Sequence, residues 1–364
     1  MESYVIGIGL HSPSKALADF RLEEIVYHTA RAALDDAGVT RNQLDHVTLG
    51  ASDEFDGRSI SSMLMAMPAG AYLTDEIRVT DSGASAFCLA TARLKSEEFD
   101  LGMVASWCKP SKTIVEVFMR LRGDPFFTRP LGINMSISDA LFAQAVAKTF
   151  NVSDNEVCER VVKAYERAAN NPRGMKYDVP SLNDIRESTL ESTPLRIGHR
   201  APITDGAVCM VLASERWLQR HPGHQPLARI AGVGWSTDSY RLGRNRLSDL
   251  VSAQKAWGQA VGNDPAKIDL IEIEAQTGYH EAAYVRAFKL SDSIKISPSG
   301  GAFAQNPLFC TGLVGAAEAI LQVAGRAGPV QLPNVRCAAA HSCHGFAQQG
   351  NVVMIFEEPG IDHG

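Results

Sequence analysis

The sequence lacks long apolar runs, a charged leader and basic clusters, and each absence argues against a class of protein. No segment approaches the roughly 18 consecutive apolar residues of a membrane span, and the opening residues MESYVIGIGL carry no positively charged region. We therefore expect a cytoplasmic protein that does not engage a membrane. The formal net charge is −6, and Lys and Arg are nowhere concentrated among aromatic residues, which argues against nucleic-acid binding.

Paired cysteines are also missing. The seven cysteines are odd in number and scattered without the CxxC spacing typical of a zinc site: Cys88, Cys108, Cys158, Cys209, Cys310, Cys337 and Cys343. We expect reduced thiols, with no metal and no redox cofactor. A largely disordered chain is excluded, because 45% of the 364 residues are apolar and 21% are charged, which is the composition of a globular protein.

What is present is an internal repeat. A helical pattern at 23–38 leads through a loop into an apolar strand at 46–52, and the same order recurs at 252–276 with an offset of 224 residues. Gly38 then matches Gly262, and Asp45 matches Asp269. A glycine-containing strand precedes each copy, and a strand–turn–helix–strand segment follows each. Alternating strands and helices predict an α/β layered fold with largely parallel sheets, built as two copies of one half.

The two predicted domains are 1–225 and 226–364. Residues from about 110 to 200 have no counterpart in the second half and carry helical patterns such as DALFAQAVAKTF. We interpret this segment as an insertion on the first half, where loops over a sheet edge commonly shape a substrate pocket.

The duplicated halves, TDGAVCMVLAS at 204–214, PSGGAFAQNPLFCTG at 298–312 and HSCHGFAQQGNVVMIFE at 341–357 together resemble the thiolase superfamily. Within it, the chain is most similar to the sterol-carrier-protein-type thiolases and acetyl-CoA acetyltransferase-like proteins. The resemblance spans nearly the whole chain and implies an αβαβα layered fold. It also implies a coenzyme A thioester as substrate or ligand, with no tightly bound cofactor and with no assignable coenzyme A contacts.

The family's nucleophilic cysteine is replaced. In the family it begins a helix, where unpaired N–H groups and the helix dipole favour a thiolate. The matching stretch here runs from Asp81 to Ala86 and puts Gly83 at that position. Cys88 lies five residues further on, about 7.5 Å along a helix axis and on another face. We expect Cys88 to be a small buried apolar residue.

Two further family positions have changed. Asn306 stands where a Gly-His-Pro motif has its histidine, and asparagine can donate to a carbonyl but cannot exchange a proton near neutral pH. Glu274 stands where the family has an Asn or His after the repeated strand. An ionised carboxylate only accepts hydrogen bonds, so it would repel an oxyanion unless it were protonated.

A fourth family element survives in part. Cys343, His344 and Gly345 match a Cys-x-Gly whose thiol acts as a base in the family, and His341 lies two residues before. Either histidine could titrate near pH 6.5 and move a proton. The alternative is that these residues lie at a strand end and hold backbone carbonyls.

Several other polar residues have functional and structural interpretations that the sequence leaves open. Ser82 and Ser85 flank Gly83, and helix-start serines are usually caps. Tyr279 and His280 could supply a phenol and an imidazole near Glu274, or simply be exposed at a helix start. The charged residues after the first repeat's strand could border a partner's pocket or be solvated: Asp53, Glu54, Asp56 and Arg58.

Three functions follow from this pattern. The first is a thiolase-like subunit that lacks the nucleophile and works with a catalytic thiolase-like chain or a small OB-fold acyl-CoA-binding protein. The second is a retro-aldolase that cleaves a β-hydroxyacyl-CoA with a base and an oxyanion hole but no acyl-enzyme. The third is an acyltransferase with a relocated nucleophile, Cys343 or Cys88. The family also pairs through an edge strand of the first half, so we expect IRVTDSG at 77–83 to form a dimer or heteromer interface.

Overall fold

The fold is known from a computed structural model, which describes residues 1–57, 60–80, 82–262 and 268–360. Arg58 and Asp81 therefore lie outside the described residues, as does part of the second repeat's loop. Ten strands form one hydrogen-bonded sheet in the order β10-β9-β11-β12-β8-β1-β7-β4-β2-β3 within this part of the chain. Their bounds are β1 Ser3–Leu10, β2 His46–Ala51, β3 Asp75–Thr80, β4 Leu101–Cys108, β7 Gly206–Ser214, β8 Ala228–Thr237, β9 Leu270–Ile273, β10 Lys295–Ile296, β11 Cys337–His344 and β12 Gly350–Glu357.

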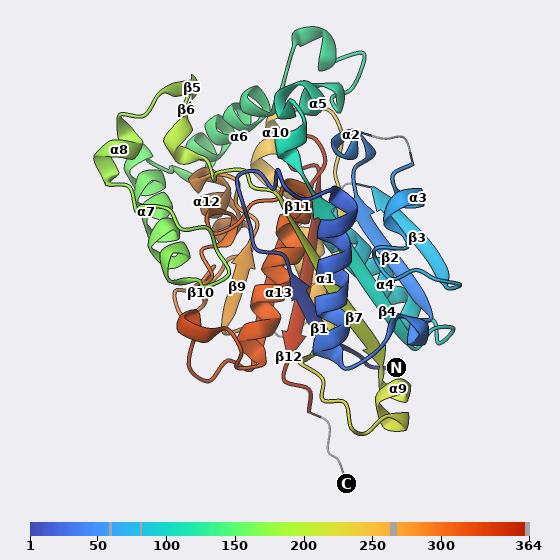
Figure 1. Ribbon diagram of the computed structural model, residues 1–364. Coiled ribbons are helices and arrows are strands. Elements are labelled where there is room, and N and C mark those ends of the chain that lie inside the picture. The colour runs from blue at the N-terminus through green and yellow to red at the C-terminus, as the bar shows by residue number, and fades with distance from the viewer. Residues whose placement is uncertain (58–59, 81, 263–267, 361–364) are drawn as a thin grey trace.

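Helices cover both halves of the sheet and fill the space between them (Figure 1). Their bounds are α1 Leu22–Ala37, α2 Asp53–Asp56, α3 Ser62–Met65, α4 Gly83–Lys95, α5 Val115–Leu121, α6 Met135–Phe150, α7 Asp154–Asn170, α8 Leu182–Arg186, α9 Glu215–Arg220, α10 Arg244–Asp249, α11 Val251–Val261, α12 Gly278–Ala287 and α13 Thr311–Val323. A short hairpin, β5 Leu190–Ser192 and β6 Leu195–Arg196, stands apart from the large sheet.

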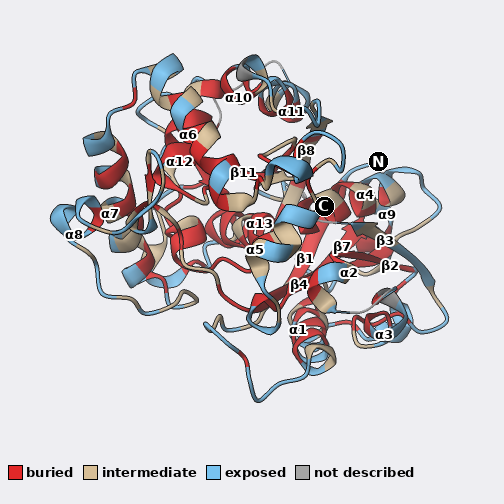
Figure 2. Ribbon diagram, turned by 90° about the horizontal axis from the view of Figure 1, so that it is seen from above, coloured by how far each residue is buried: buried red, intermediate tan, exposed pale blue. Residues whose placement is uncertain are grey.

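The helices α4 and α13 form the central layer. The core around them joins Phe87 and Leu313 of these helices to strand residues of both halves, such as Val104 and Met354. A second core packs α1 on the outer face of the first half, and a third packs α11 and α12 on the outer face of the second. The order helix, sheet, helix, sheet, helix confirms the expected αβαβα layers of the thiolase fold. Figure 2 shows buried residues along the strands and α12, whereas α8 is largely exposed.

The repeat predicted from the sequence is present in both halves, but the prediction of largely parallel sheets is wrong, because β1, β7, β8 and β12 make antiparallel pairs. Helix α1 leads to β2, which pairs in parallel with β3 and β4, and α11 leads to β9, which pairs in parallel with β10 and β11. The two matched aspartates make equivalent hydrogen bonds. Asp45 Oδ2 accepts from the N–H of Leu101 at 2.9 Å, and Asp269 Oδ2 accepts from the N–H of Cys337 at 3.0 Å. Each carboxylate thereby ties the start of its central parallel strand to the neighbouring strand.

The segment from about 110 to 200 carries α5 to α8 and contributes no strand to the large sheet. Helix α6 packs against α12 and α10, so the insertion covers the ends of β9 and β11 (Figure 1). It therefore brings residues from the first half of the chain to the second half of the sheet. In the described residues, no helix is both long and apolar enough to cross a membrane.

Candidate functional site

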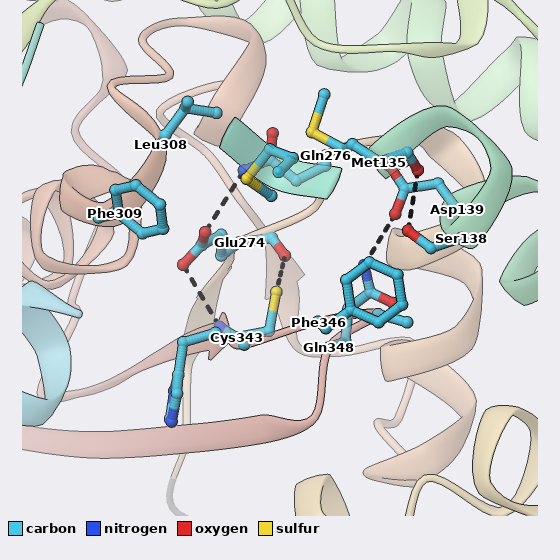
Figure 3. Close-up of a pocket in the computed structure, with 14 residues that line it drawn as sticks. Met135, Ser138, Asp139, Glu274, Gln276, Leu308, Phe309, Cys343, Phe346 and Gln348 are labelled. Carbon is cyan, nitrogen blue, oxygen red and sulfur yellow. Dashed lines mark hydrogen bonds between the residues drawn. The ribbon is translucent and has the colours of Figure 1, made fainter. Parts of the chain in front are cut away.

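A pocket lies where β9 and β11 end, beneath the insertion. It encloses about 610 Å³, counting space open to solvent. Figure 3 shows its walls: Glu274 follows β9, Cys343 belongs to β11, and α6 supplies Asp139. His344 of β11 also lines the pocket. The remaining lining residues are mostly apolar or come from the loop after β11: Met119, Met135, Leu308, Phe309, Phe346 and Ala347, with the polar Ser138, Gln276 and Gln348.

Glu274 is the buried carboxyl of this pocket. Its Oε2 accepts from the Ser342 hydroxyl at 2.7 Å and from the Cys343 N–H at 3.3 Å, and its Oε1 accepts from Gln276 Nε2 at 3.3 Å. Burial raises the pKa of Glu274 to about 7, against the lowering effect of these three donors. A carboxyl that exchanges its proton near neutral pH is suited to general acid–base catalysis. The prediction that Glu274 must be protonated to sit near an oxyanion is therefore compatible with its environment.

The Cys343 thiol faces the pocket beside this carboxyl. Its Sγ donates to the Glu274 backbone carbonyl at 3.8 Å. Burial, followed by the charge of Glu274, raises the pKa of Cys343 well above its ordinary value. The fully buried Tyr284 lies behind it, and burial raises the pKa of that phenol as well. At neutral pH both groups keep their protons, so Cys343 is a weak nucleophile and a possible proton donor.

His341 and His344 do not titrate near pH 6.5, which corrects the sequence-based expectation. Burial lowers the pKa of each ring to about 4, because a charged imidazolium would lose its hydration. His341 is 1% exposed, its Nε2 lies 2.9 Å from Asn351 Oδ1, and its ring packs on Tyr284, away from the pocket. His344 lines the pocket and lies over Gly350. Both rings are neutral at physiological pH.

Asn306 lies one layer behind the pocket wall. Its Nδ2 donates to Gln276 Oε1 at 2.7 Å, and its Oδ1 accepts from Gln276 Nε2 at 3.0 Å and from the Thr311 hydroxyl at 2.8 Å. These bonds occupy the amide, which does not line the pocket. Asn306 is therefore placed to orient Gln276, which reaches the pocket in its stead.

The start of α4 has no room for a nucleophile. A Cβ on Gly83 would lie 2.6 Å from Ser106 Oγ, 2.7 Å from Ser106 Cβ and 3.0 Å from Leu313 Cβ. The Ser106 hydroxyl is fixed by its hydrogen bond to the Gly50 carbonyl, at 2.7 Å. Position 83 therefore carries no side chain, and side chains of β4 and α13 occupy the space that one would need.

The neighbours of Gly83 have structural roles. Ser82 caps α4 by accepting from the Ser85 N–H at 3.2 Å, as its position predicted. Cys88 is 2% exposed, and burial raises the pKa of its thiol to about 12. The interpretation of Cys88 as a small buried residue is confirmed. All seven cysteines are free thiols, as expected.

Tyr279 and His280 are buried rather than exposed, which corrects one of their two interpretations. The Tyr279 ring lies against His199, outside the pocket, while His280 stacks on Phe142 of α6 with ring centroids 4.6 Å apart. The insertion packs directly on this helix start, a contact that no sequence pattern predicted. Burial lowers the pKa of His280 and raises that of Tyr279 to about 12.

The acidic residues of α2, which follows β2, are held by hydrogen bonds and ion pairs within the protein and are not simply solvated. Asp56 accepts from Trp107 Nε1 at 3.1 Å and from the Ser61 hydroxyl, and its side chain is 1% exposed. Asp53 accepts from the N–H groups of residues 60 and 61 and pairs with Arg78. Glu54 accepts from the Ser52 hydroxyl. These bonds shape the loop beside β3, and none of the three acids lines the pocket.

Sequence reasoning missed the polar pair opposite Glu274. Asp139 of α6 accepts from Gln348 Nε2 at 3.0 Å and pairs with Arg200 Nη1 at 2.6 Å, at the pocket wall in Figure 3. Asp139 lies within the insertion and Gln348 follows β11, so their partnership depends on how the insertion folds. The only sequence signal was an acidic residue within the apolar pattern of α6.

The sequence of this chain is similar to those of an acetyltransferase and a sterol carrier protein. Acetyl-CoA acetyltransferase of Methanothermobacter thermautotrophicus is 23% identical over 356 residues, which cover 90% of this chain and 93% of that protein. Sterol carrier protein 2 of Rattus norvegicus is 25% identical over 206 residues, and these cover 50% of this chain but 38% of that protein. In sequence, the chain thus resembles proteins of the thiolase superfamily. No protein-family model matches it.

Solved structures of an aldolase and of a thiolase have a fold similar to that of this chain. An Ltp2-ChsH2(DUF35) aldolase superposes with a TM-score of 0.81 at 16% identity, covering 99% of this chain and 98% of that chain. Human mitochondrial 3-ketoacyl-CoA thiolase superposes with a TM-score of 0.81 at 17% identity, covering 99% of both chains. The same enzyme in complex with CoA gives a TM-score of 0.80. The chain thus shares one fold with both an aldolase and a thiolase.

Proposed function

We propose that the protein cleaves or forms a carbon–carbon bond of an acyl-CoA by aldol chemistry, without an acyl-cysteine. The observation that carries this proposal is Glu274, a pocket carboxyl with a pKa of about 7, in a chain whose position for the family nucleophile, Gly83, is closed. Acyl transfer needs a thiolate, whereas aldol cleavage needs a base and stabilisation of an enolate. The Ltp2-ChsH2(DUF35) aldolase has the same fold, as does a thiolase, so the fold is compatible with this chemistry and the choice rests on the residues of the site.

The proposed steps use the pocket groups in the direction of cleavage. The Glu274 carboxylate takes the proton from the β-hydroxyl of a β-hydroxyacyl-CoA. The Cα–Cβ bond then breaks, the β-carbon becomes a carbonyl, and the electron pair moves into the thioester as an enolate. Gln276 Nε2, which already points to Glu274, is the proposed donor to the enolate oxygen. The Cys343 thiol protonates the α-carbon and recovers its proton from Glu274, so the products are a carbonyl compound and a shortened acyl-CoA.

The second candidate is a subunit without activity of its own. It is favoured by the closed position at Gly83 and by the hydrogen bonds that occupy Asn306. Such a chain would complete the site of a second thiolase-like chain. In either case we propose a partner, a second thiolase-like chain or a small OB-fold acyl-CoA-binding protein. The aldolase with the similar fold is itself an assembly with a DUF35 protein. A cytoplasmic location and coenzyme A thioesters as ligands belong to the same proposal.

We further propose that two copies pair through β3, which is an edge strand as the sequence predicted. Ile77 on this strand is 40% exposed, and nearby apolar side chains are more open, with Leu73 at 93% and Met63 at 78%. An open, apolar strand edge is a template for pairing with another chain. The second copy would cover both the strand and these side chains.

The test separates aldol cleavage from thiolysis and from inactivity. The purified protein is incubated with a β-hydroxyacyl-CoA in the absence of free CoA, and separately with acetoacetyl-CoA plus free CoA. Release of a carbonyl compound and a shortened acyl-CoA in the first reaction, with none in the second, is expected. Cleavage only with free CoA would contradict the proposal and require a nucleophilic cysteine. Inactivity in both reactions, with activity restored to a co-purified chain, would favour the subunit.

A further inference from the structure

A cysteine, a histidine and an aspartate meet at the start of α7, outside the pocket. Asp154 and Cys158 are four residues apart and share one face of the helix. His199 approaches them from the loop between β6 and β7. Cys158 and His199 are fully buried, while the Asp154 side chain is 47% exposed. One ligand-type atom from each residue lies within 4.8 Å of the other two.

The three contacts are long: the two that involve sulfur are weak hydrogen bonds, and the contact between His199 and Asp154 is longer than an ordinary N–H···O bond. His199 Nε2 lies 3.5 Å from Asp154 Oδ1 and 3.7 Å from Cys158 Sγ, and that sulfur lies 3.9 Å from Asp154 Oδ2. An N–H···O bond is normally about 2.7–3.2 Å long. A tetrahedral zinc ion with bonds of about 2.0–2.3 Å holds its ligand atoms about 3.3–3.6 Å apart. His199 Nε2 and Cys158 Sγ therefore lie within a few tenths of an ångström of this spacing from each other, and each lies near it from one oxygen of Asp154, Oδ1 for the nitrogen and Oδ2 for the sulfur.

We propose that Asp154, Cys158 and His199 bind a divalent ion of the zinc type. Sulfur, imidazole nitrogen and carboxylate oxygen together are a ligand set for Zn²⁺ rather than for Mg²⁺ or Ca²⁺. On binding, the Cys158 thiol releases its proton to solvent, and the thiolate and carboxylate balance the two charges of the ion. The exposed side of Asp154 leaves the fourth corner to water.

The groups around His199 and Cys158 have opposing effects on metal binding. The His199 Nδ1 atom accepts from the Arg196 N–H at 3.3 Å, a long bond that a metal-bound imidazole, with its proton on Nδ1, must give up. Burial and then the charge of Asp154 raise the pKa of the Cys158 thiol, which opposes its loss of a proton to the metal. The positive charges of Arg186 and Arg196 partly offset this shift but repel the ion itself. We therefore expect binding to be weaker than at a four-ligand structural zinc site.

The ion would join two segments that the pocket depends on. Helix α7 begins at Asp154, and His199 is followed directly by Arg200, whose guanidinium pairs with the pocket residue Asp139 at 2.6 Å. The Ala201 N–H in turn donates to the Gln276 carbonyl at 2.9 Å. A metal bond at His199 would hold this strip of chain in place, so its role is positioning. The inference stands independently of the proposed aldol chemistry.

The experiment uses Co²⁺ as a spectroscopic probe of the full-length protein. After treatment with a chelator and a reductant, the protein is titrated with Co²⁺, and the sulfur-to-cobalt charge-transfer absorption is followed. One equivalent of Co²⁺ with this absorption is expected, and Zn²⁺ should displace it. Cys158→Ser should abolish the absorption, and Asp154→Asn, an exposed change that should leave the fold intact, should weaken binding about 100-fold or more.

The matched control is His221→Gln, which removes a half-buried histidine near His224 that could take up metal weakly. It should keep the full absorption and affinity. The proposal would be overturned by an absence of Co²⁺ uptake, or by uptake without the thiolate absorption. Uptake that Asp154→Asn leaves unchanged would overturn it equally, and this outcome does not depend on whether Cys158→Ser folds.

Discussion

At the scale of single residues, the chemistry depends on which groups hold protons at neutral pH. Glu274 is the pocket group that exchanges its proton there, while burial keeps the Cys343 thiol protonated and the His344 imidazole neutral. These three residues all lie at the ends of β9 and β11. The site therefore favours proton transfer by a carboxyl over attack by sulfur.

Restoring the family nucleophile should disturb the fold rather than restore thiolase chemistry. In Gly83→Cys the new Cβ meets Ser106 at 2.6 Å, so we expect a loss of about 1–3 kcal/mol in the free energy of unfolding. Ser106→Gly in the same chain removes the closest atoms and should recover part of that loss. Urea unfolding of the single and double variants measures both effects. An unchanged stability in Gly83→Cys would show that the position is open.

No acyl-enzyme should form on this chain. Burial raises the pKa values of Cys88, to about 12, and of Cys343, so neither thiol supplies a thiolate at pH 7. Mass spectrometry of protein incubated with acetyl-CoA should show the unmodified mass. Alkylation of the denatured protein at all seven cysteines is the control that the thiols are intact. An acetyl group on the Cys343 peptide would instead support the relocated nucleophile.

At the scale of elements, the site depends on how closely β9 and β11 approach α13. A Cβ on Gly312 would lie 2.1 Å from Ser342 Oγ and 2.7 Å from Glu274 Oε2, whereas a Cβ on Gly315 would lie 3.5 Å from Glu272 Cβ. The first distance is impossible without movement, and the second is ordinary contact. Gly312 therefore leaves space for the Glu274 carboxyl and its Ser342 partner at the start of the helix.

These two glycines form a matched pair on one helix. Gly312→Ala should lower the free energy of unfolding by about 2 kcal/mol or more and disturb Glu274, because the new methyl group overlaps strand side chains. Gly315→Ala should be neutral or stabilising by up to about 1 kcal/mol, since alanine has the higher helix propensity. Thermal unfolding compares them. Equal effects from the two changes would contradict the close approach at Gly312.

The repeat shows what the sequence could and could not predict. The helices and strands of both copies were readable from periodicity, and the matched Asp45 and Asp269 keep the same strand-to-strand bonds. The candidate residues Glu274 and Cys343 were also found, through the family motifs. Their proton affinities were not, because a pKa depends on burial, which comes from packing near α13 for Glu274 and beside Tyr284 of α12 for Cys343. The Asp139–Gln348 contact could not be predicted either, because it depends on how the insertion packs against the loop after β11.

At the scale of the whole molecule, the proposed dimer depends on β3 lying at the edge of the sheet. In the proposed dimer, Ile77 and the apolar side chains around it are covered by a second copy. Ile77→Lys places a charge in that interface and should convert dimer to monomer, with at least a tenfold weaker association. Sedimentation at several protein concentrations measures this. The control is Val251→Lys, which charges an apolar side chain of similar exposure, 40%, in the second half of the chain. A wild-type monomer, or equal effects of the two changes, would contradict pairing through β3.

The most direct test of the central claim is the pH dependence of β-hydroxyacyl-CoA cleavage in the wild type and in Glu274→Gln. If the Glu274 carboxylate is the base, cleavage should rise as pH increases through about 7, where the carboxyl loses its proton. Glu274→Gln should be about 100-fold slower or worse and lose that rise, while Glu159→Gln on the exposed face of α7 should match the wild type. Cleavage by Glu274→Gln at the wild-type rate, with the same pH profile, would contradict the role of Glu274.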